Sequence, residues 1–210
     1  MIASYNKAAM GDNLIVILKP DVASQDISKN GSVVRIFNTE NNETIGFNFI
    51  NASEFVTDLD GVGEIKLTDK QIKILNQKIV EAGFDDQLEI DNEPKFVVGY
   101  VKSTTKHPDS DHLLITETEV EDGKTVQIVS GSPNMTDNIK VVVAKVGAMM
   151  PSGLIIWPGE LRGVESNGMI CSGRELGLKN APTKKGALIL PDDFVVGTEF
   201  DFDKGNQIFK

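Results

Sequence analysis

Most apolar runs of this chain have the length of strands, and a single segment has the periodicity of a helix. This pattern constrains the fold more than any other feature. The helical pattern begins with Thr68 and Gln71, which have the spacing of a capping box, and it ends at Gly83, a residue typical of a helix C-terminus. Its apolar residues share one helical face: Ile72, Leu75 and Ile79. The other apolar runs are short and bounded by turn residues, as strands are. The chain is therefore predicted to be β-rich.

Four runs of strand length precede the helical segment, at residues 2–5, 13–18, 32–37 and 44–50. The last run alternates Ile45, Phe47 and Phe49 with smaller or polar residues, which favours a strand with one buried face. Asn41 and Asn42, just before it, suit a hairpin turn. Strands followed by one amphipathic helix predict a small α+β domain.

The acidic, polar segment of residues 88–94 (LEIDNEP) ends in a proline and predicts a domain boundary. We therefore expect an N-terminal domain at residues 1–92 and a second domain at residues 95–203. The first domain contains no histidine, no cysteine and no phosphate-loop glycine pattern. Its scattered carboxylates indicate a solvated acidic surface, and its role is not evident from the sequence.

The second domain has the pattern of a small β structure. Strand-like runs occupy residues 96–103, 113–120, 125–129 and 139–146, and residues 154–157 and 187–190 offer further candidates. Asp122-Gly123 is a hairpin signal between two of these runs. Several short strands in such a length suit a small closed barrel, although the strand pattern alone also allows a sandwich.

The charge balance is unfavourable for a nucleic-acid-binding protein. The chain has 21 basic and 31 acidic residues, a net charge of -10 and a pI near 4.7, whereas phosphate contacts require Lys and Arg. The acidity is concentrated in residues 1–94, which have a net charge of -8, against -2 for residues 95–210. Composition thus weighs against RNA binding mainly for the first domain.

Three separated segments of the second domain carry the most distinctive chemistry. They are HPDSDHLL at residues 107–114, IVSGSPN at residues 128–134 and LRGVESNGMICSGRELGL at residues 161–178. The third combines four glycines with varied polar side chains, which suggests a shaped surface loop. Within it, residues 172–177 also have the pattern of one helical turn, capped by a serine and ended by a glycine.

Taken together and in this order, the three segments closely resemble the tRNA-binding domain family. That family includes free-standing bacterial proteins of the YtpR type, the N-terminus of phenylalanyl-tRNA synthetase β subunits and the C-terminus of methionyl-tRNA synthetases. The resemblance covers about residues 96–202 and implies an OB-fold barrel. Free-standing YtpR-type members also carry an extra N-terminal domain of unknown role, and the length of this chain is similar to that arrangement.

The resemblance also implies which side chains contact tRNA. Ser166, Met169 and Ser172 match the S-x-x-M-x-x-S positions of the family, where hydroxyls bind sugar or phosphate and a thioether packs on a base or ribose. Asn134, in the SGSPN turn, is a weaker candidate for the same surface. His112 stands where members of the family usually have a lysine, so that a fixed positive charge is missing there.

A basic cluster borders the same loop. It consists of Arg174, Lys179, Lys184 and Lys185, with Glu175 as its one acidic neighbour. Such charges attract phosphates without reading sequence. Arg174, Lys184 and Lys185 are therefore added to the expected tRNA-binding residues.

Catalytic readings of the second domain are weaker. His107, Asp109, Asp111 and His112 resemble a metal-binding cluster in composition, but the chain has no third histidine and the pattern fits a turn whose aspartates accept backbone N–H bonds. Cys171 could be a nucleophile only if folding brought a base to it. We expect no catalytic residue, no metal and no cofactor.

The sequence thus predicts a cytoplasmic, non-catalytic RNA-binding protein that recognises tRNA by shape and backbone. The alternative is a protein-binding or chaperone-like module on the same OB-fold, which the acidic composition favours. We expect tRNA rather than DNA as the ligand and no membrane association, since no apolar run is long enough to span a bilayer. Related domains often form homodimers, for which residues 161–168 or the C-terminal tail are candidates. The acidic first domain could bind a protein partner.

Overall fold

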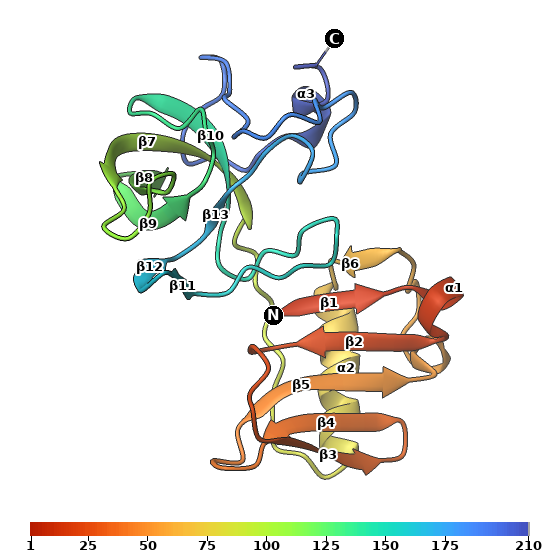
Figure 1. The fold of residues 1–210 in the computed structure, drawn as a ribbon. Coiled ribbons are helices and arrows are strands. Elements are labelled where there is room, and N and C mark those ends of the chain that lie inside the picture. Colours follow the sequence, from red (N-terminus) through yellow and green to blue (C-terminus); the bar gives the residue numbers. More distant parts are fainter. Residues whose placement is uncertain (210) are drawn as a thin grey trace. The chain divides into compact units, whose positions relative to one another are not determined.

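The computed structural model describes residues 1–209. The chain forms two compact units, Met1–Asn92 and a second unit that starts at Glu93. Each unit has its own sheet and its own hydrophobic core (Figure 1). Strands predominate in both, as the sequence predicted.

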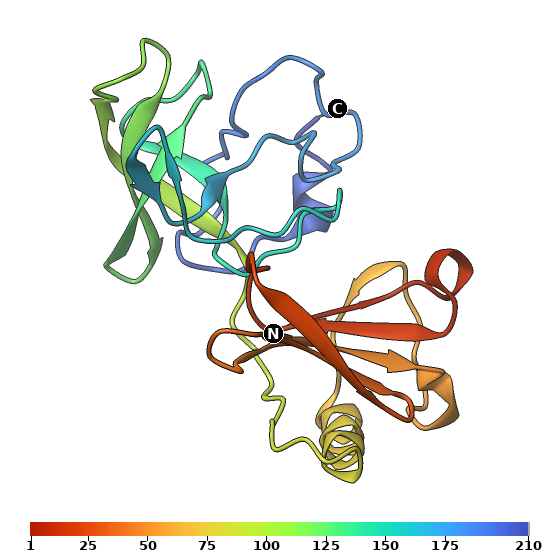
Figure 2. The ribbon, with the colours of Figure 1, turned by 60° about the horizontal axis from the view of Figure 1, so that its bottom comes forward.

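The first unit is an antiparallel sheet of six strands in the order β3-β4-β5-β2-β1-β6. Its strands are β1 (Ile2–Tyr5), β2 (Asn13–Ile17), β3 (Gln25–Asn30), β4 (Val33–Asn38), β5 (Thr44–Ile50) and β6 (Gly63–Ile65). A short helix, α1 (Lys7–Met10), a 3₁₀ turn, η1 (Ala52–Glu54), and the helix α2 (Asp69–Glu81) complete it. Figure 2 shows α2 on one side of the sheet. This arrangement confirms the predicted small α+β domain.

The helix α2 forms where the sequence predicted it. Thr68 and Gln71 complete a capping box, in which the Thr68 hydroxyl accepts from the Gln71 N–H at 3.3 Å and the side-chain Oε1 of Gln71 accepts from the Thr68 N–H at 2.9 Å. The apolar face of α2 packs against the sheet through Leu75 and Ile79, which are fully buried beside Phe47. The helix therefore closes the core of the first unit.

Two strands of this unit, β3 and β6, were not predicted. β3 lies at the edge of the sheet and is exposed along most of its length, so its sequence QDISKN shows no apolar alternation. β6 forms the opposite edge and has only three residues. Edge strands are held by backbone pairing with one neighbour rather than by a buried face, which is why a hydrophobic pattern does not reveal them.

A polar network joins β1 to the segment after β5. The carboxylate of Asp12 accepts hydrogen bonds from the Tyr5 hydroxyl at 2.7 Å and from the Ser53 hydroxyl at 2.6 Å. The bonds from Ser53 and then Tyr5 lower the pKa of Asp12, and the bond to Asp12 raises the pKa of Tyr5 to about 12. The network therefore favours the ionised form of Asp12 in the folded domain.

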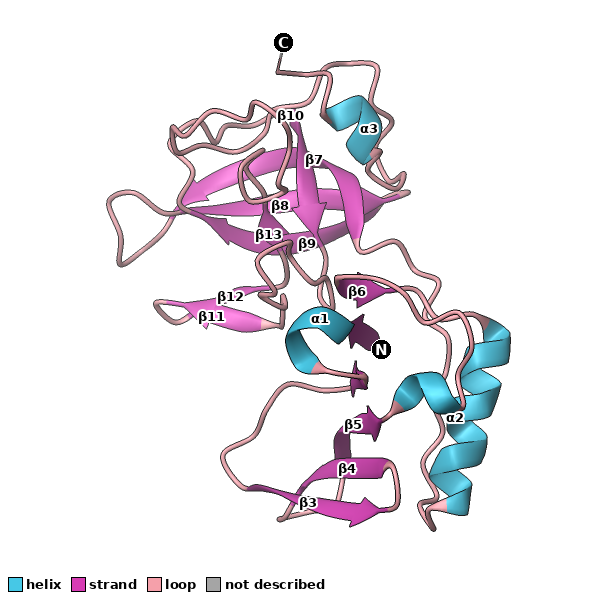
Figure 3. Ribbon diagram, turned by 90° about the vertical axis from the view of Figure 1, so that its right-hand side faces the viewer, coloured by secondary structure: helices cyan, strands magenta, loops and turns pink. Residues whose placement is uncertain are grey.

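The second unit contains a five-stranded sheet in the order β13-β10-β7-β8-β9. Its elements are β7 (Phe96–Lys106), β8 (Leu114–Glu121), β9 (Lys124–Ser130), β10 (Ile139–Ala144), β11 (Gly159–Leu161), β12 (Val164–Ser166), β13 (Met169–Ile170) and α3 (Phe202–Gly205). The sheet curls until β12 and β13 come back against β9 (Figure 3). The curled sheet confirms the predicted OB-type barrel and excludes the sandwich.

The pair β7 and β10 is buried on both faces. Val141 and Val143 of β10 belong to the cluster inside the barrel, whereas Val142 and Ala144 belong to a second cluster on the outer face. The outer cluster contains side chains from residues 171–200, including Leu176, Leu178, Leu188, Leu190, Phe194 and Phe200. The continuous apolar run of β10 reflects this double burial, since a strand with one solvated face would alternate. β8 does alternate, with Thr116, Thr118 and Val120 buried.

Several predicted boundaries of this unit were wrong. β7 continues to Lys106 instead of ending near Ser103, with a register shift between Val101 and Ser103. Residues 154–157 and 187–190 form only isolated bridges, at Ile155 and Ile189. The hairpin of β11 and β12 and the two-residue strand β13 were not predicted, because glycines and charged residues give these segments no apolar period.

No helix in the described part of the chain is long and apolar enough to cross a membrane. The longest, α2, has 13 residues.

We expect Thr68→Ala to destabilise α2 by about 1 kcal/mol, the usual cost of losing an N-cap side chain. Native-state hydrogen exchange of the α2 amides measures this locally, without assuming that both units unfold together. The control is Lys73→Ala, an exposed position of the same helix. Equal protection of α2 in the two variants would contradict the prediction.

We expect Asp12→Asn to make the first unit less stable at neutral pH and less sensitive to acid. Because the folded-state pKa of Asp12 is lowered, its ionised form contributes stability above its ordinary pKa, and this contribution is lost as the pH falls through the folded pKa. The wild-type and variant proteins should therefore converge in acid. Hydrogen exchange of the β1 and β2 amides, measured between about pH 6 and pH 3, tests this, and parallel pH profiles would refute it.

Candidate nucleic-acid interface

The loop that carries the expected tRNA-binding residues lies on the outer face of β10. The Cys171 N–H donates to the Val142 carbonyl at 2.9 Å, and the Leu188 N–H donates to the Cys171 carbonyl at 2.9 Å. Leu176 and Leu178, between these two anchors, are buried in the outer cluster. The polar residues of the loop are thus displayed from an anchored backbone.

Residues 172–177 form the single capped turn that the sequence predicted. The Ser172 hydroxyl accepts from the Glu175 N–H at 3.2 Å, and the Glu175 carboxylate accepts from the Ser172 N–H at 2.7 Å. Gly173 packs against the ring of Phe209, where an added Cβ would lie 2.6 Å from a ring carbon. Any larger residue would push the C-terminal segment away from this turn. No sequence pattern predicted the contact with Phe209.

Asn134 is joined to the same loop. Its side-chain amide donates to the Ala187 carbonyl at 2.9 Å and accepts from the Ala187 N–H at 2.8 Å. Asn134, Ser172 and Lys184 line one cavity of about 170 Å³. The structure therefore brings together three residues that are far apart in the sequence, but the amide of Asn134 already holds the loop and is engaged within the fold.

Ser166 is also engaged internally. It is 5% exposed, and its hydroxyl accepts from the Val129 N–H at 3.1 Å and donates to the Gly168 carbonyl at 3.3 Å. These bonds attach the end of β12 to β9. The hydroxyl of Ser166 thus positions the start of the loop. Ser172 is half-buried, and its hydroxyl also donates internally, to the Glu175 carboxylate at 2.7 Å.

Met169 and Arg174 line a second cavity of about 340 Å³, together with Met150, Pro151, Ser152, Leu154 and Glu175. Met169 is half-buried, whereas the Arg174 side chain is exposed. A thioether next to a guanidinium offers an apolar surface beside a positive charge. Such a surface can hold a ribose or base whose phosphate is bound by the arginine.

The basic cluster of Arg174, Lys179, Lys184 and Lys185 is exposed, and within residues 1–209 none of its side chains forms an ion pair. Most lysines elsewhere in the second unit are paired, whereas Lys106 and Lys140 form no ion pair within the described residues and Lys140 donates to backbone carbonyls. Lys102 binds Glu119, Lys124 binds Glu121, Lys145 binds Glu93 and Lys204 binds Asp193. The unit therefore leaves a group of positive charges available beside the candidate loop.

His107 and His112 have different environments. His107 is 3% exposed, and its Nδ1 accepts from the Asp109 N–H at 3.0 Å while its Nε2 lies 3.0 Å from the Leu161 carbonyl. The turn is therefore closed by the imidazole of His107 and the hydroxyl of Ser110, and the prediction that its aspartates accept the backbone bonds was wrong. His112 is exposed at the end of this turn. It lies outside the group formed by Asn134, Ser172 and Lys184.

The candidates for catalysis are poorly placed. Cys171 is fully buried, and burial raises the pKa of its thiol to about 12, so the nucleophilic thiolate is suppressed. Both ring nitrogens of His107 are occupied by the fold. Among residues 1–209, no group of three His, Cys, Asp or Glu side chains is arranged to hold a metal ion.

The expected dimer contact at residues 161–168 forms the β11 and β12 hairpin, in which Leu161 is 41% exposed. The dimer itself stays a prediction.

Comparisons with known proteins place each unit in a family. The model described as "Domain of unknown function (DUF4479)" matches residues 20–91, and the model described as "Putative tRNA binding domain" matches residues 96–199. The C-terminal domain of Plasmodium vivax p43 is a similar solved structure, with a TM-score of 0.37, 25% identity and coverage of 52% of this chain and 61% of that one.

Among curated relatives, the "Putative tRNA-binding protein YtpR" of Bacillus subtilis (strain 168) is 47% identical over 204 residues, which are 96% of this chain and 100% of that protein. The phenylalanine–tRNA ligase beta subunit of Oceanobacillus iheyensis is 49% identical over 111 residues, which are 50% of this chain and 14% of that subunit. The second match is confined to a small part of the ligase subunit. The fold and these matches define a two-domain protein with a tRNA-binding-type barrel. Because the first match spans both proteins almost completely, the chain belongs to the YtpR family.

We expect His107→Ala to loosen the β11 and β12 hairpin and to destabilise the second unit by about 1–3 kcal/mol, since it removes a buried imidazole together with its contacts to the Leu161 carbonyl and the Asp109 N–H. Hydrogen exchange of the hairpin amides and urea unfolding followed by Trp157 fluorescence measure the two effects. The matched control is His112→Ala, which removes the exposed histidine of the same turn. Equal stability of the two variants would show that the His107 contacts are dispensable.

Proposed function

We propose that the protein is a non-catalytic, cytoplasmic RNA-binding protein whose barrel binds folded tRNA by shape and backbone. The observation that carries this proposal is the group of exposed cations without ion pairs on the anchored loop of residues 171–190. The printed name of the Bacillus subtilis relative and the description of the family model support tRNA as the ligand.

In this proposal, phosphates bind to Arg174, Lys184 and Lys185. A charge without a carboxylate partner meets a phosphate without first losing an ion pair, so each such contact retains its full attraction. The Ser172 hydroxyl, whose proton is donated to Glu175, accepts from a ribose hydroxyl, and Met169 packs against a ribose or base beside Arg174. These contacts recognise backbone and shape rather than base sequence.

Two other expected residues affect tRNA binding indirectly, by positioning the loop. Ser166 and Asn134 hold the loop by internal hydrogen bonds, so their substitution weakens tRNA binding indirectly. His112, on the exposed turn, makes at most a peripheral contact, and a neutral imidazole gives it less attraction for phosphate than the lysine usual in the family.

The acidity of the chain is compatible with this function because most of it lies elsewhere. Residues 1–94 account for -8 of the net charge of -10. In the barrel, Glu93, Glu119 and Glu121 are occupied by lysines outside the candidate loop. The local charge around Lys184 and Lys185 is therefore positive although the protein is acidic, and screening limits repulsion from distant carboxylates to about 8–10 Å at physiological salt.

We expect Lys184→Ala combined with Lys185→Ala to weaken tRNA binding and to reduce its salt dependence. Each lost phosphate contact should lower the slope of log affinity against log salt by about 0.7–0.9. Fluorescence anisotropy with labelled total tRNA at several salt concentrations measures both quantities. Addition of Arg174→Ala should weaken binding further.

The matched control combines Lys102→Ala with Lys124→Ala, which removes the same net charge from lysines paired with glutamates. This control should lower affinity much less. Equal losses for the two double variants would mean that only net charge matters and that the loop is not the interface. Binding of unfolded peptides with little salt dependence, and no preference for tRNA over duplex DNA, would favour the protein-binding alternative instead.

A further inference from the structure

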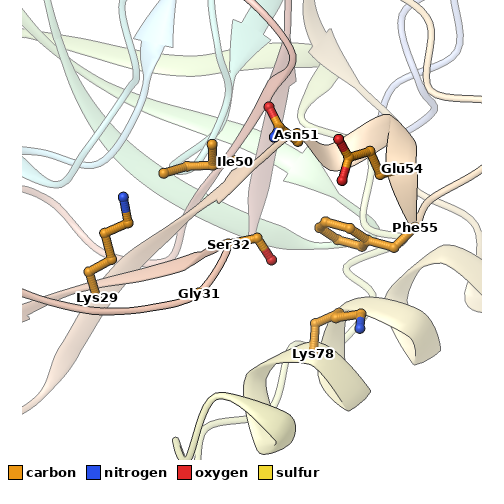
Figure 4. A pocket seen from close by; sticks show the side chains of 8 residues that line it. All are labelled: Lys29, Gly31, Ser32, Ile50, Asn51, Glu54, Phe55 and Lys78. Atoms are coloured by element: carbon orange, nitrogen blue, oxygen red, sulfur yellow. The ribbon is translucent and has the colours of Figure 1, made fainter.

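The first unit contains a cavity of about 450 Å³ with a predominantly polar lining (Figure 4). Its walls come from three separate elements, namely the β3 to β4 turn, the end of β5 with η1, and α2. The lining residues are Lys29, Gly31, Ser32, Ile50, Asn51, Glu54, Phe55 and Lys78. No sequence pattern predicted this grouping, because its members are separated by turns and share no motif.

The walls of the cavity are held by contacts within the domain. The Ile50 N–H donates to the Ser32 carbonyl at 2.8 Å, which fixes the β3 to β4 turn against the end of β5. The Phe55 ring packs edge-on against buried Phe49, with centroids 6.4 Å apart. Lys78 lies over Phe55, with its Nζ 5.7 Å from the ring centroid, and pairs with Glu81 at 2.7 Å. The aromatic wall is therefore a fixed part of the domain.

Four polar side chains of this lining, unlike Lys78, take no part in the hydrogen bonds and ion pairs of the described residues. Within residues 1–209, the side chains of Lys29, Ser32, Asn51 and Glu54 form no hydrogen bond or ion pair. Figure 4 shows Lys29 at one end of the cavity and Glu54 beside Phe55 at the other, with Ser32 between them. The site thus has a cation at one end and an acceptor next to an apolar ring at the other.

We propose that this cavity binds a nucleoside monophosphate. The phosphate binds to Lys29, the base lies along Phe55, and Glu54 accepts hydrogen bonds from the amino or imino groups of the base while Asn51 supplies both a donor and an acceptor. The cavity volume lies within the range of about 300–1,000 Å³ that is usual for sites of ligands of this size. Inorganic phosphate or a free amino acid would leave most of that volume, and one of the two charged ends, without contacts.

This inference is independent of the tRNA-binding proposal, since no lining residue belongs to the barrel. The nucleotide could come from two sources that share this chemistry, a free mononucleotide or a nucleotide of an RNA chain. The two sources are distinguished by whether tRNA competes with the mononucleotide for the full-length protein.

The experiment is calorimetric titration of the full chain with AMP, CMP, GMP and UMP, and with adenosine and inorganic phosphate as reference ligands. At least one monophosphate should bind more tightly than its nucleoside and than phosphate. Lys29→Ala should weaken it at least about tenfold, the loss expected for one charge-assisted hydrogen bond. Glu54→Gln should change the order of preference among the four bases.

The matched control is Lys70→Ala, which removes an exposed lysine of α2 that does not line the cavity and should leave the affinity unchanged. The Lys184→Ala and Lys185→Ala variant should also bind the nucleotide normally, so that failure of one proposal is separable from failure of the other. Competition by tRNA would identify an RNA nucleotide as the occupant, and simultaneous binding would identify a free one. The proposal is overturned if no monophosphate binds better than phosphate, or if Lys29→Ala binds as well as the wild type.

Discussion

The burial of β10 on both faces is the constraint on which the second unit depends. Val141 and Val143 fill the barrel, and Val142 and Ala144 support the residues that follow the barrel in the chain. Because the outer face of the strand is apolar, the segment of residues 171–190 lies against it instead of projecting into solvent. Leu176, Leu178 and Leu188 anchor that segment, and its polar residues are consequently displayed with little freedom. A binding loop that is ordered before it meets its ligand loses less conformational entropy on binding.

The distribution of ion pairs then decides where an acidic protein can attract a polyanion. In the second unit the glutamates beside the sheet pair with Lys102, Lys124 and Lys145. The cations of the loop of residues 171–190 have no carboxylate partner within the described chain. Net charge is a property of the whole surface, whereas phosphate binding depends on charges within about one Debye length of 8–10 Å. A net charge of -10 is for this reason compatible with a local interface for RNA.

In the first unit, a helix closes the core and leaves a cavity beside it. Its core is sealed by α2, whose capping box sets the start of the helix. Where α2, η1 and the β3 to β4 turn meet, the packing leaves a cavity in which four polar side chains take no part in the hydrogen bonds and ion pairs of the described residues. Groups that stabilise nothing in the free protein are available to a ligand. The two units therefore offer chemically distinct surfaces. The barrel has an exposed basic loop, and the α+β domain has an open cavity lined by side chains of both charges.

The sequence by itself determined the elements whose signal is local. Four local elements were predicted, because each depends on side chains a few residues apart. They are the α2 helix, the hairpin at Asn41-Asn42, the β8 strand and the capped turn at Ser172. The resemblance of three segments also gave the barrel and the class of ligand. Tertiary structure decided what depends on distant partners. The fold pairs the exposed edge strand β3 with β4 and joins the Asn134 amide to the Ala187 carbonyl. It also places the Ser166 hydroxyl in an internal hydrogen bond and brings the His107 imidazole to the Leu161 carbonyl. It also assembled Lys29, Glu54 and Phe55 around one cavity, since only the folded chain brings together side chains that no local pattern relates.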